Sequence, residues 1–353
     1  MIKQVYYLGG TSPSGFCSKF TEQIKQPGFY TYILKGGPGT GKSTLMKKIA
    51  DAFSDHPVSL YYCSSDIRSL DAVVIEDKKI IVADGTAPHV FEAYYPGASQ
   101  EIINLGEFWD GEMLKKHSDA IHYLLDENLK YHARVRCYIK ALASLNADIY
   151  SIGDDALNRE KLDGYISRLC RKVTGKKKSG ERGKISFKQL SAFTTENYST
   201  KPLIGDYSVY LLHDECFAGS DYFLRNVADY LVNQGCDVTV SECTMHHTPV
   251  FEHIFSESAG IAFMTSNFLN RLENPSAATV NFGRFYDKEL IAAKKQRLSF
   301  DRKAVLELSK EAADALSTAL AVHDELEKNY VNAIDFRKLG SFTDKFIKSL
   351  KNI

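Results

Sequence analysis

The segment at residues 36–43 holds the side chains best suited to chemistry, because it reads GGPGTGKS and fits the pattern G-x-x-x-x-G-K-[ST]. An apolar, β-prone run precedes it, and apolar residues recur at helical spacing after it. Glycines let backbone N–H groups approach phosphate oxygens without interference from a Cβ atom, and a helix start adds partial positive charge. We therefore expect a P-loop that binds a nucleoside triphosphate, formed by Gly36, Gly37, Pro38, Gly39, Thr40, Gly41, Lys42, Ser43 and Thr44.

Two side chains of this loop and one later carboxylate should complete the catalytic site. Lys42 would reach the β- and γ-phosphates, and the Ser43 hydroxyl would bind Mg²⁺. Asp84 ends an apolar run typical of a Walker B strand, so we expect it to hold the Mg²⁺ through a water molecule. An aspartate at this point could instead cap a turn. Gly85 follows it where many ATPases have a water-activating glutamate, which argues against fast hydrolysis by the chain alone.

Asp66 is a further catalytic candidate, because it follows the strand-like run at residues 58–63. Ligands of open α/β sheets gather outside the carboxyl ends of the strands, so Asp66 should lie on the same rim as Asp84. In a kinase, a carboxylate there can orient the acceptor hydroxyl. The other interpretation is an Asx turn that leads into residues 67–70.

The chain also matches itself, which indicates an internal duplication. Residues 32–53 align with residues 210–231 at an offset of 178, without a gap. Residues 103–114, INLGEFWDGEML, align with residues 280–291, VNFGRFYDKELI, at an offset of 177. Five identities fall in register in the second pair, and Trp109 aligns with Tyr286. We expect two P-loop-like α/β domains in tandem, each with a mainly parallel sheet and a helical appendage after it.

The second copy lacks the phosphate-binding chemistry. Ser220 stands in place of Lys42, and Asp221 stands in place of Ser43. Asp214 and Glu215 bring negative charge to the loop, and Thr265 or Ser266 takes the position of Asp84. An acidic loop repels phosphate, so we expect one nucleotide per chain. The second domain either completes or regulates the first site, or it is a decayed duplicate that contributes stability.

A possible metal site in the second copy involves five residues that follow two predicted strands. Imidazole and thiolate groups bind Zn²⁺ and similar ions, although this spacing matches no standard motif. The alternative is a polar rim or an interface. The residues are His213, Cys216, Cys243, His246 and His247.

The elements that must position these groups suggest an α/β chain of two domains. Helical spacing is predicted at residues 107–148, 155–173, 300–329 and 342–350. The glycine- and lysine-rich stretch at residues 175–186 is expected to be a basic flexible linker. The predicted domains are therefore residues 1–174, the nucleotide-binding domain, and residues 187–353, the degenerate one.

Composition restricts the classes of function. The 353 residues include 44 Lys and Arg against 44 Asp and Glu, and this balance argues against a nucleic-acid coat or a membrane-surface protein. No apolar run approaches the roughly 18 residues of a membrane span. Seven cysteines, an odd number, favour reduced thiols in the cytoplasm.

Three stretches resemble a poorly characterised bacterial family of tandem P-loop ATPases, labelled ATP-binding or nucleotide kinase-like. They are YILKGGPGTGKSTLMKKIADAF, YCSSDIRSLDAVVI and VADGTAPHVFEAYYPGASQEIINLGEFWD. The resemblance covers nearly the whole chain and is most specific in residues 30–110. It implies ATP binding by residues 36–44 and Asp84. The second half of such proteins often retains its own P-loop, which this chain does not.

Three functions remain open at this point. The leading hypothesis is an enzyme that binds Mg-ATP and hydrolyses it slowly. The first alternative is a small-molecule or nucleotide kinase with Asp66 on the acceptor side. The second is a non-catalytic, nucleotide-dependent switch or scaffold for a protein or, less expected, a nucleic acid.

Overall fold

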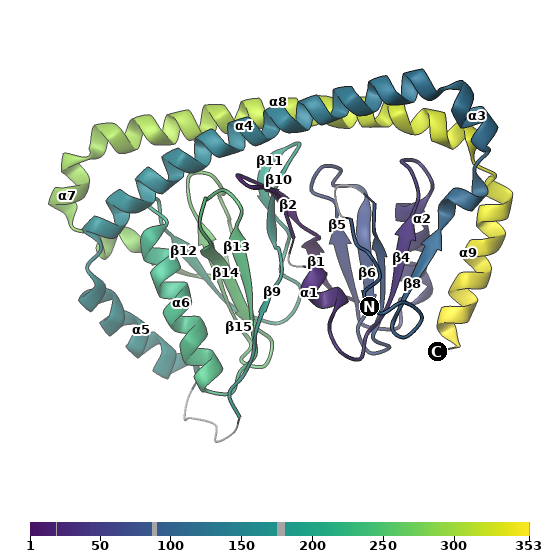
Figure 1. Cartoon of the computed structure of the whole chain (residues 1–353). Coiled ribbons are helices and arrows are strands. Elements are labelled where there is room, and N and C mark those ends of the chain that lie inside the picture. Colours follow the sequence, from purple (N-terminus) through teal and green to yellow (C-terminus); the bar gives the residue numbers. More distant parts are fainter. Residues whose placement is uncertain (19, 87–89, 175–180, 353) are drawn as a thin grey trace. The chain divides into compact units, whose positions relative to one another are not determined.

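The structure, a computed structural model, describes residues 1–18, 20–86, 90–174 and 181–352. It has an α/β architecture with two six-stranded mixed sheets (Figure 1). Only β6 runs antiparallel to its neighbours in the first sheet, so that sheet is mostly parallel. Its strands, in spatial order, are β1 (Ile2–Tyr7), β5 (Val58–Tyr62), β6 (Leu70–Ile75), β7 (Ile80–Asp84), β4 (Tyr30–Lys35) and β8 (Gln100–Asn104).

The second sheet repeats this topology. It is also parallel except for one inserted strand, β14, which is antiparallel to both neighbours. The matching order confirms the expectation of two similar α/β folds. Its strands are β9 (Ile185–Phe187), β13 (Val238–Cys243), β14 (Val250–Ser256), β15 (Ile261–Ser266), β12 (Ser208–His213) and β16 (Ala278–Asn281). Two small hairpins accompany the sheets: β2 (Gly10–Ser12) with β3 (Gly15–Cys17), and β10 (Ser191–Thr194) with β11 (Asn197–Thr200).

The inserted antiparallel strands were not expected from the sequence. Every residue of β6 and of β14 is buried, as central strands covered on both faces must be. The run LDAVVI in β6 carries the β-branched residues typical of such a strand. Its polarity pattern contains no information on direction, which depends on the short connections to β5 and β7.

The helices follow the same duplication. The α3, α4 and α5 helices begin and end 177 residues before α7, α8 and α9, respectively. The bounds are α1 (Phe20–Ile24), α2 (Lys42–Ala52), α3 (Gly111–Lys116), α4 (Ser118–Ala156), α5 (Arg159–Thr174), α6 (Ala218–Asn233), α7 (Lys288–Ala293), α8 (Lys295–Ala333) and α9 (Phe336–Lys351), with 3₁₀ turns η1 (Leu105–Phe108) and η2 (Phe282–Arg284).

The chain divides into two compact units whose limits differ from the predicted boundaries. The first unit contains residues 1–9, 18–135 and 313–353, and the second contains residues 10–17 and 136–312. Each 39-residue helix, α4 and α8, therefore contributes one half to each unit. A helix of that length spans about 58 Å, more than one small sheet can cover. Each appendage is consequently shared between the units instead of packing only on the sheet before it.

In each unit, a pair of main-chain hydrogen bonds joins the segment that follows the sheet to the end of the long helix that comes from the other half of the sequence. In the first unit, the N–H groups of Asp110 and Asp335 donate to the carbonyls of Ala333 and Phe108, at 2.7 and 2.8 Å. The second unit repeats this pair at 2.8 Å each, from Asp287 to Ala156 and from Asn158 to Phe285. Equivalent residues thus form the same pair of hydrogen bonds in both units, and we call each pair a seam.

The predicted flexible linker needs correction at its end. Residues 175–180 lie outside the described residues, but residues 185 and 186 form the start of β9. Gly183 N–H donates to the Val232 carbonyl at 2.9 Å, and Lys184 N–H donates to Asp237 at 2.8 Å. These bonds hold Gly183 and Lys184 against α6 and the loop that follows it.

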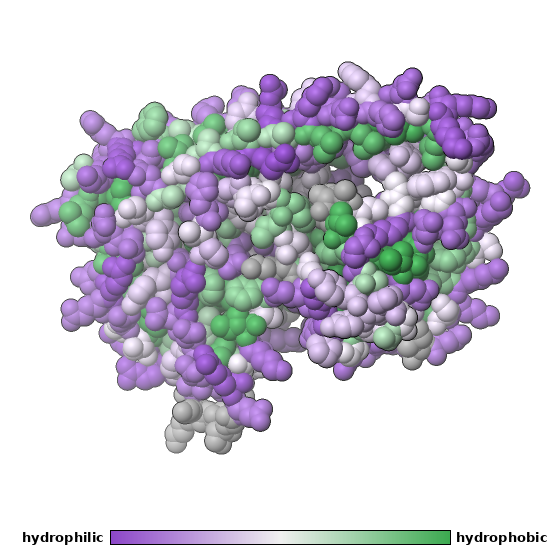
Figure 2. All heavy atoms as spheres, viewed as in Figure 1, coloured by the Kyte–Doolittle hydropathy of each residue, from purple (hydrophilic) through white to green (hydrophobic). Residues whose placement is uncertain are grey.

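The surface of the view in Figure 2 is mostly hydrophilic, with hydrophobic side chains interspersed along the long helices at its top. Among the described residues, none of the helices combines the length and the hydropathy that crossing a bilayer requires.

Candidate functional site

The glycine loop, residues 36–43, connects the carboxyl end of β4 to the start of α2. Gly39 and Gly41 have φ angles of 67° and 82°, in the left-handed region that side chains disfavour. A Cβ on Gly36 would lie 2.7 Å from the Thr40 Oγ1, and one on Gly37 would lie 2.6 Å from the Tyr330 ring. The loop therefore needs its glycines for conformation and for close approach.

Lys42, the first residue of α2, bends back over this loop. Its Nζ donates to the carbonyls of Gly36 and Gly37 at 2.9 and 2.8 Å. The same atom lies 3.7 Å from the Asp84 Oδ2, and both side chains are nearly buried. The predicted cation and the predicted carboxylate are thus brought together at the carboxyl end of the first sheet.

Asp84 ends β7, which pairs in parallel with β4 so that Asp84 lies beside Leu34. It accepts hydrogen bonds from the Thr86 N–H and hydroxyl at 2.8 and 2.6 Å. Burial nevertheless raises the pKa of Asp84, against the lowering effects of Lys42 and Thr86. A desolvated carboxylate of this kind gains from a nearby cation.

Two further oxygen groups near the end of the first sheet bear on the magnesium ion expected from the sequence. The Ser43 hydroxyl, 3.0 Å from the Leu70 N–H, lies on the same rim. Asp71, on β6, is a buried carboxylate whose charge adds to the raised pKa of Asp84, and sequence reasoning missed it. A charged residue inside the apolar run LDAVVI was the available signal. Mg²⁺ prefers hard oxygen ligands and needs only one or two carboxylates beside substrate phosphates.

Asp66 lies on the predicted turn after β5. Its Oδ1 accepts hydrogen bonds from the Arg68 N–H and Nε, and its Oδ2 accepts one from the Ser69 hydroxyl at 2.6 Å. Burial opposes its ionisation, but these bonds outweigh burial and lower the pKa of Asp66. The geometry is that of a carboxylate that anchors a turn.

The sequence did not predict that residues of α8 would cover the glycine loop. The Gly39 N–H donates to the Glu327 Oε1 at 3.1 Å, across 288 residues of sequence. The Glu327 carboxylate also lies 3.5 Å from the His323 Nε2. A hydrogen bond from His323, and then the one from Gly39, lower the pKa of Glu327. A side-chain carboxylate therefore occupies the Gly39 amide of the glycine loop.

Two aromatic rings extend this cover. Tyr330 lies against Gly37, and the Trp109 ring centroid is 5.8 Å from that of Tyr330. All of these residues belong to the first unit. No sequence pattern connects residues 323–331 to the glycine loop, because the contact arises only when the second half of α8 joins the first unit.

In the corresponding loop of the second unit, side chains of the same unit accept hydrogen bonds from the loop amides. The fully buried Asp214 accepts hydrogen bonds from the N–H groups of Cys216 and Ser220 at 3.0 and 2.7 Å. The Tyr286 hydroxyl donates to Asp214 and accepts from the Gly219 N–H, each at 2.8 Å. The amides of Cys216 and Ser220 are thus satisfied by an internal carboxylate, and that of Gly219 by a tyrosine hydroxyl. Strand register also identifies Thr265 as the counterpart of Asp84.

The five residues considered for a second metal site are not brought together. The His246 ring packs edge-on against Phe217, and His247 lies 3.1 Å from the Ser144 hydroxyl. Burial raises the pKa of Cys216 to about 12 and raises that of Cys243 as well. Within the described ranges, no group of three or more His, Cys, Asp or Glu side chains could hold a metal ion.

The two halves thus share one topology but differ in the chemistry at equivalent loops. One loop holds a lysine beside a buried aspartate, and the other encloses its own carboxylate. Comparisons of the chain with protein-family models, with curated proteins and with solved structures found no match.

Proposed function

We propose that this protein binds Mg-ATP at the glycine loop of its first unit and hydrolyses it slowly. The observation that carries the proposal is the position of Lys42, whose ammonium group lies between two loop carbonyls and Asp84. A strand, a glycine loop with two left-handed residues and a helix start are the parts that a P-loop requires.

In this proposal the loop amides bind the β- and γ-phosphates. Lys42 leaves the carbonyls of Gly36 and Gly37 and neutralises phosphate charge instead. The hydrogen bonds that now hold it are to uncharged carbonyls, so the exchange for a charged phosphate is favourable. Thr44, which is exposed at the start of α2, would contact the α-phosphate.

Ser43 and Asp84 would hold the Mg²⁺, which supplies charge neutralisation at the phosphates. Asp84 is suited to this role because it is desolvated and already faces Lys42. The seven cysteines are free thiols, which supports a reducing compartment such as the cytoplasm. As in the sequence-based hypothesis, Gly85 offers no water-activating carboxylate.

A nucleotide-dependent switch is the second candidate, and the Glu327 contact favours it. A phosphate that takes the Gly39 amide must displace a side chain of α8, so nucleotide binding and the helix are coupled. A kinase with Asp66 as the acceptor-side carboxylate is less favoured, because three hydrogen bonds already occupy Asp66.

Titration calorimetry with Mg-ATP tests the proposal. We expect one nucleotide per chain, and we expect Lys42→Ala to weaken binding at least about tenfold, since a charge-assisted contact contributes roughly 1.5–3 kcal/mol. Lys47→Ala, on the exposed face of the same helix, is the matched control and should leave affinity unchanged. Equal affinity for the wild-type and Lys42→Ala proteins, or two bound nucleotides, would contradict the proposal.

A further inference from the structure

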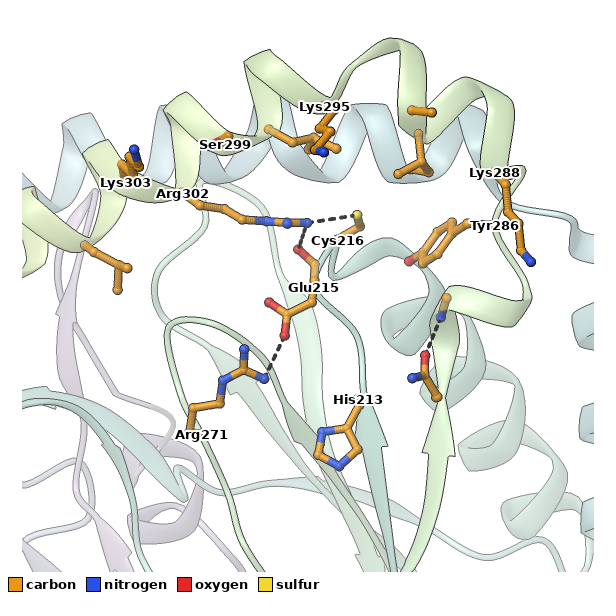
Figure 3. A pocket seen from close by; sticks show the side chains of 16 residues that line it. His213, Glu215, Cys216, Arg271, Tyr286, Lys288, Lys295, Ser299, Arg302 and Lys303 are labelled. Carbon is orange, nitrogen blue, oxygen red and sulfur yellow. Dashed lines mark hydrogen bonds and ion pairs between the residues drawn. The ribbon is translucent and has the colours of Figure 1, made fainter.

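The second unit contains a large pocket next to its filled loop, with Cys216 and Tyr286 belonging to both. Its volume is about 1010 Å³, and it opens at the carboxyl ends of β12 and β16, beneath α7 and the first half of α8 (Figure 3). His213 and Cys216 lie at the strand end, and Tyr286 lies at the side. All of its lining residues belong to the second unit.

The charge in this pocket is unbalanced. Five cationic side chains line it against a single carboxylate, Glu215, although the whole chain carries no net charge. The cationic residues are Arg271, Lys288, Lys295, Arg302 and Lys303. A concentration of one sign of charge inside a concave, partly apolar site attracts ions of the opposite sign.

The one carboxylate is already neutralised. Arg271 forms an ion pair with Glu215 at 2.7 Å, and Arg302 donates to the Glu215 carbonyl at 3.1 Å. Figure 3 shows Arg302 reaching from α8 toward Glu215 and Cys216, with Arg271 approaching Glu215 from the other side. The buried Nε of Arg302 has no hydrogen-bond partner among the residues that the structure describes. Glu215 therefore does not cancel the positive charge of the remaining residues.

Three lysines supply the free positive charge. Within the described part of the chain, Lys288, Lys295 and Lys303 have no carboxylate within ion-pair distance. Lys295 and Lys303 recur with Ser299 and Arg302 at helical spacing, so one face of α8 presents them to the pocket. Unpaired lysines on one side of a cavity are suited to the oxygens of an anion.

The walls are apolar as well as cationic. Tyr286, Ile291, Leu298 and Leu306 line the pocket together with the lysines. Phosphate groups suit several cations at once, and a ring or hydrocarbon body suits such walls. We propose that this pocket binds a small phosphorylated molecule with an apolar body, held by side-chain cations and not by loop amides. This site is independent of the nucleotide site proposed for the first unit.

The experiment uses the full chain carrying Lys42→Ala, so that the first unit does not contribute to phosphate binding. The two probes are phenyl phosphate and inorganic phosphate, and their binding is measured by titration calorimetry. We expect one phenyl phosphate per chain, bound about tenfold tighter than inorganic phosphate, because the walls bury part of the ring. Affinity for both probes should fall as salt concentration rises.

A triple variant tests the cations without disturbing the fold. Lys288→Gln, Lys295→Gln and Lys303→Gln together should weaken phenyl phosphate binding at least about thirtyfold, because each lost contact is charge-assisted. These lysines are exposed, so the melting temperature should not change. The control with the same change of charge combines Lys172→Gln, Lys310→Gln and Lys345→Gln, all outside the pocket.

Three results would overturn the inference. One is the absence of phenyl phosphate binding, and another is equal weakening by the pocket and control variants. The third is tighter binding of longer single-stranded oligonucleotides that compete with phenyl phosphate, since an extended surface would then replace the pocket as the explanation.

Discussion

The contact between Glu327 and Gly39 leads to a prediction about nucleotide affinity. The Glu327 carboxylate accepts the Gly39 N–H at 3.1 Å, at an amide that the proposed P-loop would use for phosphate. Because hydrogen bonds from His323 and Gly39 lower the pKa of Glu327, it is ionised at neutral pH. Mg-ATP must displace this negative charge, so Glu327→Gln should bind Mg-ATP more tightly than the wild-type protein.

The size of the effect follows from the charge and exposure of Glu327. A hydrogen bond to a charged group contributes roughly 1.5–3 kcal/mol, and a neutral one about 1 kcal/mol. The Glu327 side chain is 40% exposed, so solvent screening reduces the difference. Repulsion between a carboxylate and a phosphate charge about 4 Å away adds about 1 kcal/mol in water. A net gain of about 1 kcal/mol corresponds to roughly fivefold tighter binding.

Trp109 provides the assay. It is the only tryptophan of the chain, and its ring contacts Tyr330, which covers Gly37 of the loop. Nucleotide binding that displaces α8 should therefore change tryptophan fluorescence, and a titration gives the dissociation constant. Lys42→Ala should abolish the fluorescence change at the same nucleotide concentration.

Glu325→Gln is the matched control for the helix. Glu325 lies on the same helix, is exposed, and pairs with Lys328 instead of the loop. It should leave the dissociation constant unchanged. An unchanged or weaker affinity of Glu327→Gln would refute the reasoning, because it would show that Glu327 does not compete with phosphate.

Two further predictions concern the second unit. Asp214→Ala should destabilise it by about 3 kcal/mol, measured by urea denaturation, because buried N–H groups of Cys216 and Ser220 would lose their acceptor; a loss below about 1 kcal/mol would contradict this structural role. Burial lowers the pKa of His246 to about 3 from 6.5, so the unfolded chain binds the proton first as pH falls. Stability should therefore fall by up to about 1.4 kcal/mol per pH unit below roughly pH 6.5. His246→Gln should make stability depend less steeply on pH, as measured by hydrogen exchange of the β14 amides. An unchanged pH dependence would contradict the role given to His246.

Local parts of the fold were predictable because their determinants are close in sequence. The loop at residues 36–43 needs glycines at fixed positions, and Lys42 and Asp84 follow from the strand-loop-helix pattern around it. The duplication was predictable for the same reason, since three of the four seam residues recur unchanged 177 positions apart and the fourth changes from Asn158 to Asp335. The repeated strand order and helix bounds follow from these repeated signals.

Directions and partners of distant segments were not predictable. The antiparallel β6 contains a buried run that also fits a parallel strand. The Glu327 contact joins residues 288 positions apart, and nothing near Glu327 distinguishes it from other exposed glutamates on α8. Asp214 was expected to repel phosphate from the loop, but the structure also makes it the internal acceptor for two loop amides.

The two equivalent loops differ in their covers because the equivalent helix segments carry different residues. The segment of α8 that covers the first loop corresponds, at the offset of 177, to the segment of α4 in the second unit. There Gly153 stands in place of Tyr330, and a Cβ on it would lie 2.7 Å from the Cβ of Cys216. In the first unit the loop has the glycine, Gly37, and the helix has the large side chain. At each loop a glycine therefore faces a larger side chain, but the glycine lies on the loop in the first unit and on the helix in the second. In the first unit the Gly39 amide donates to Glu327 of α8, and this is the contact that the proposed nucleotide switch would break.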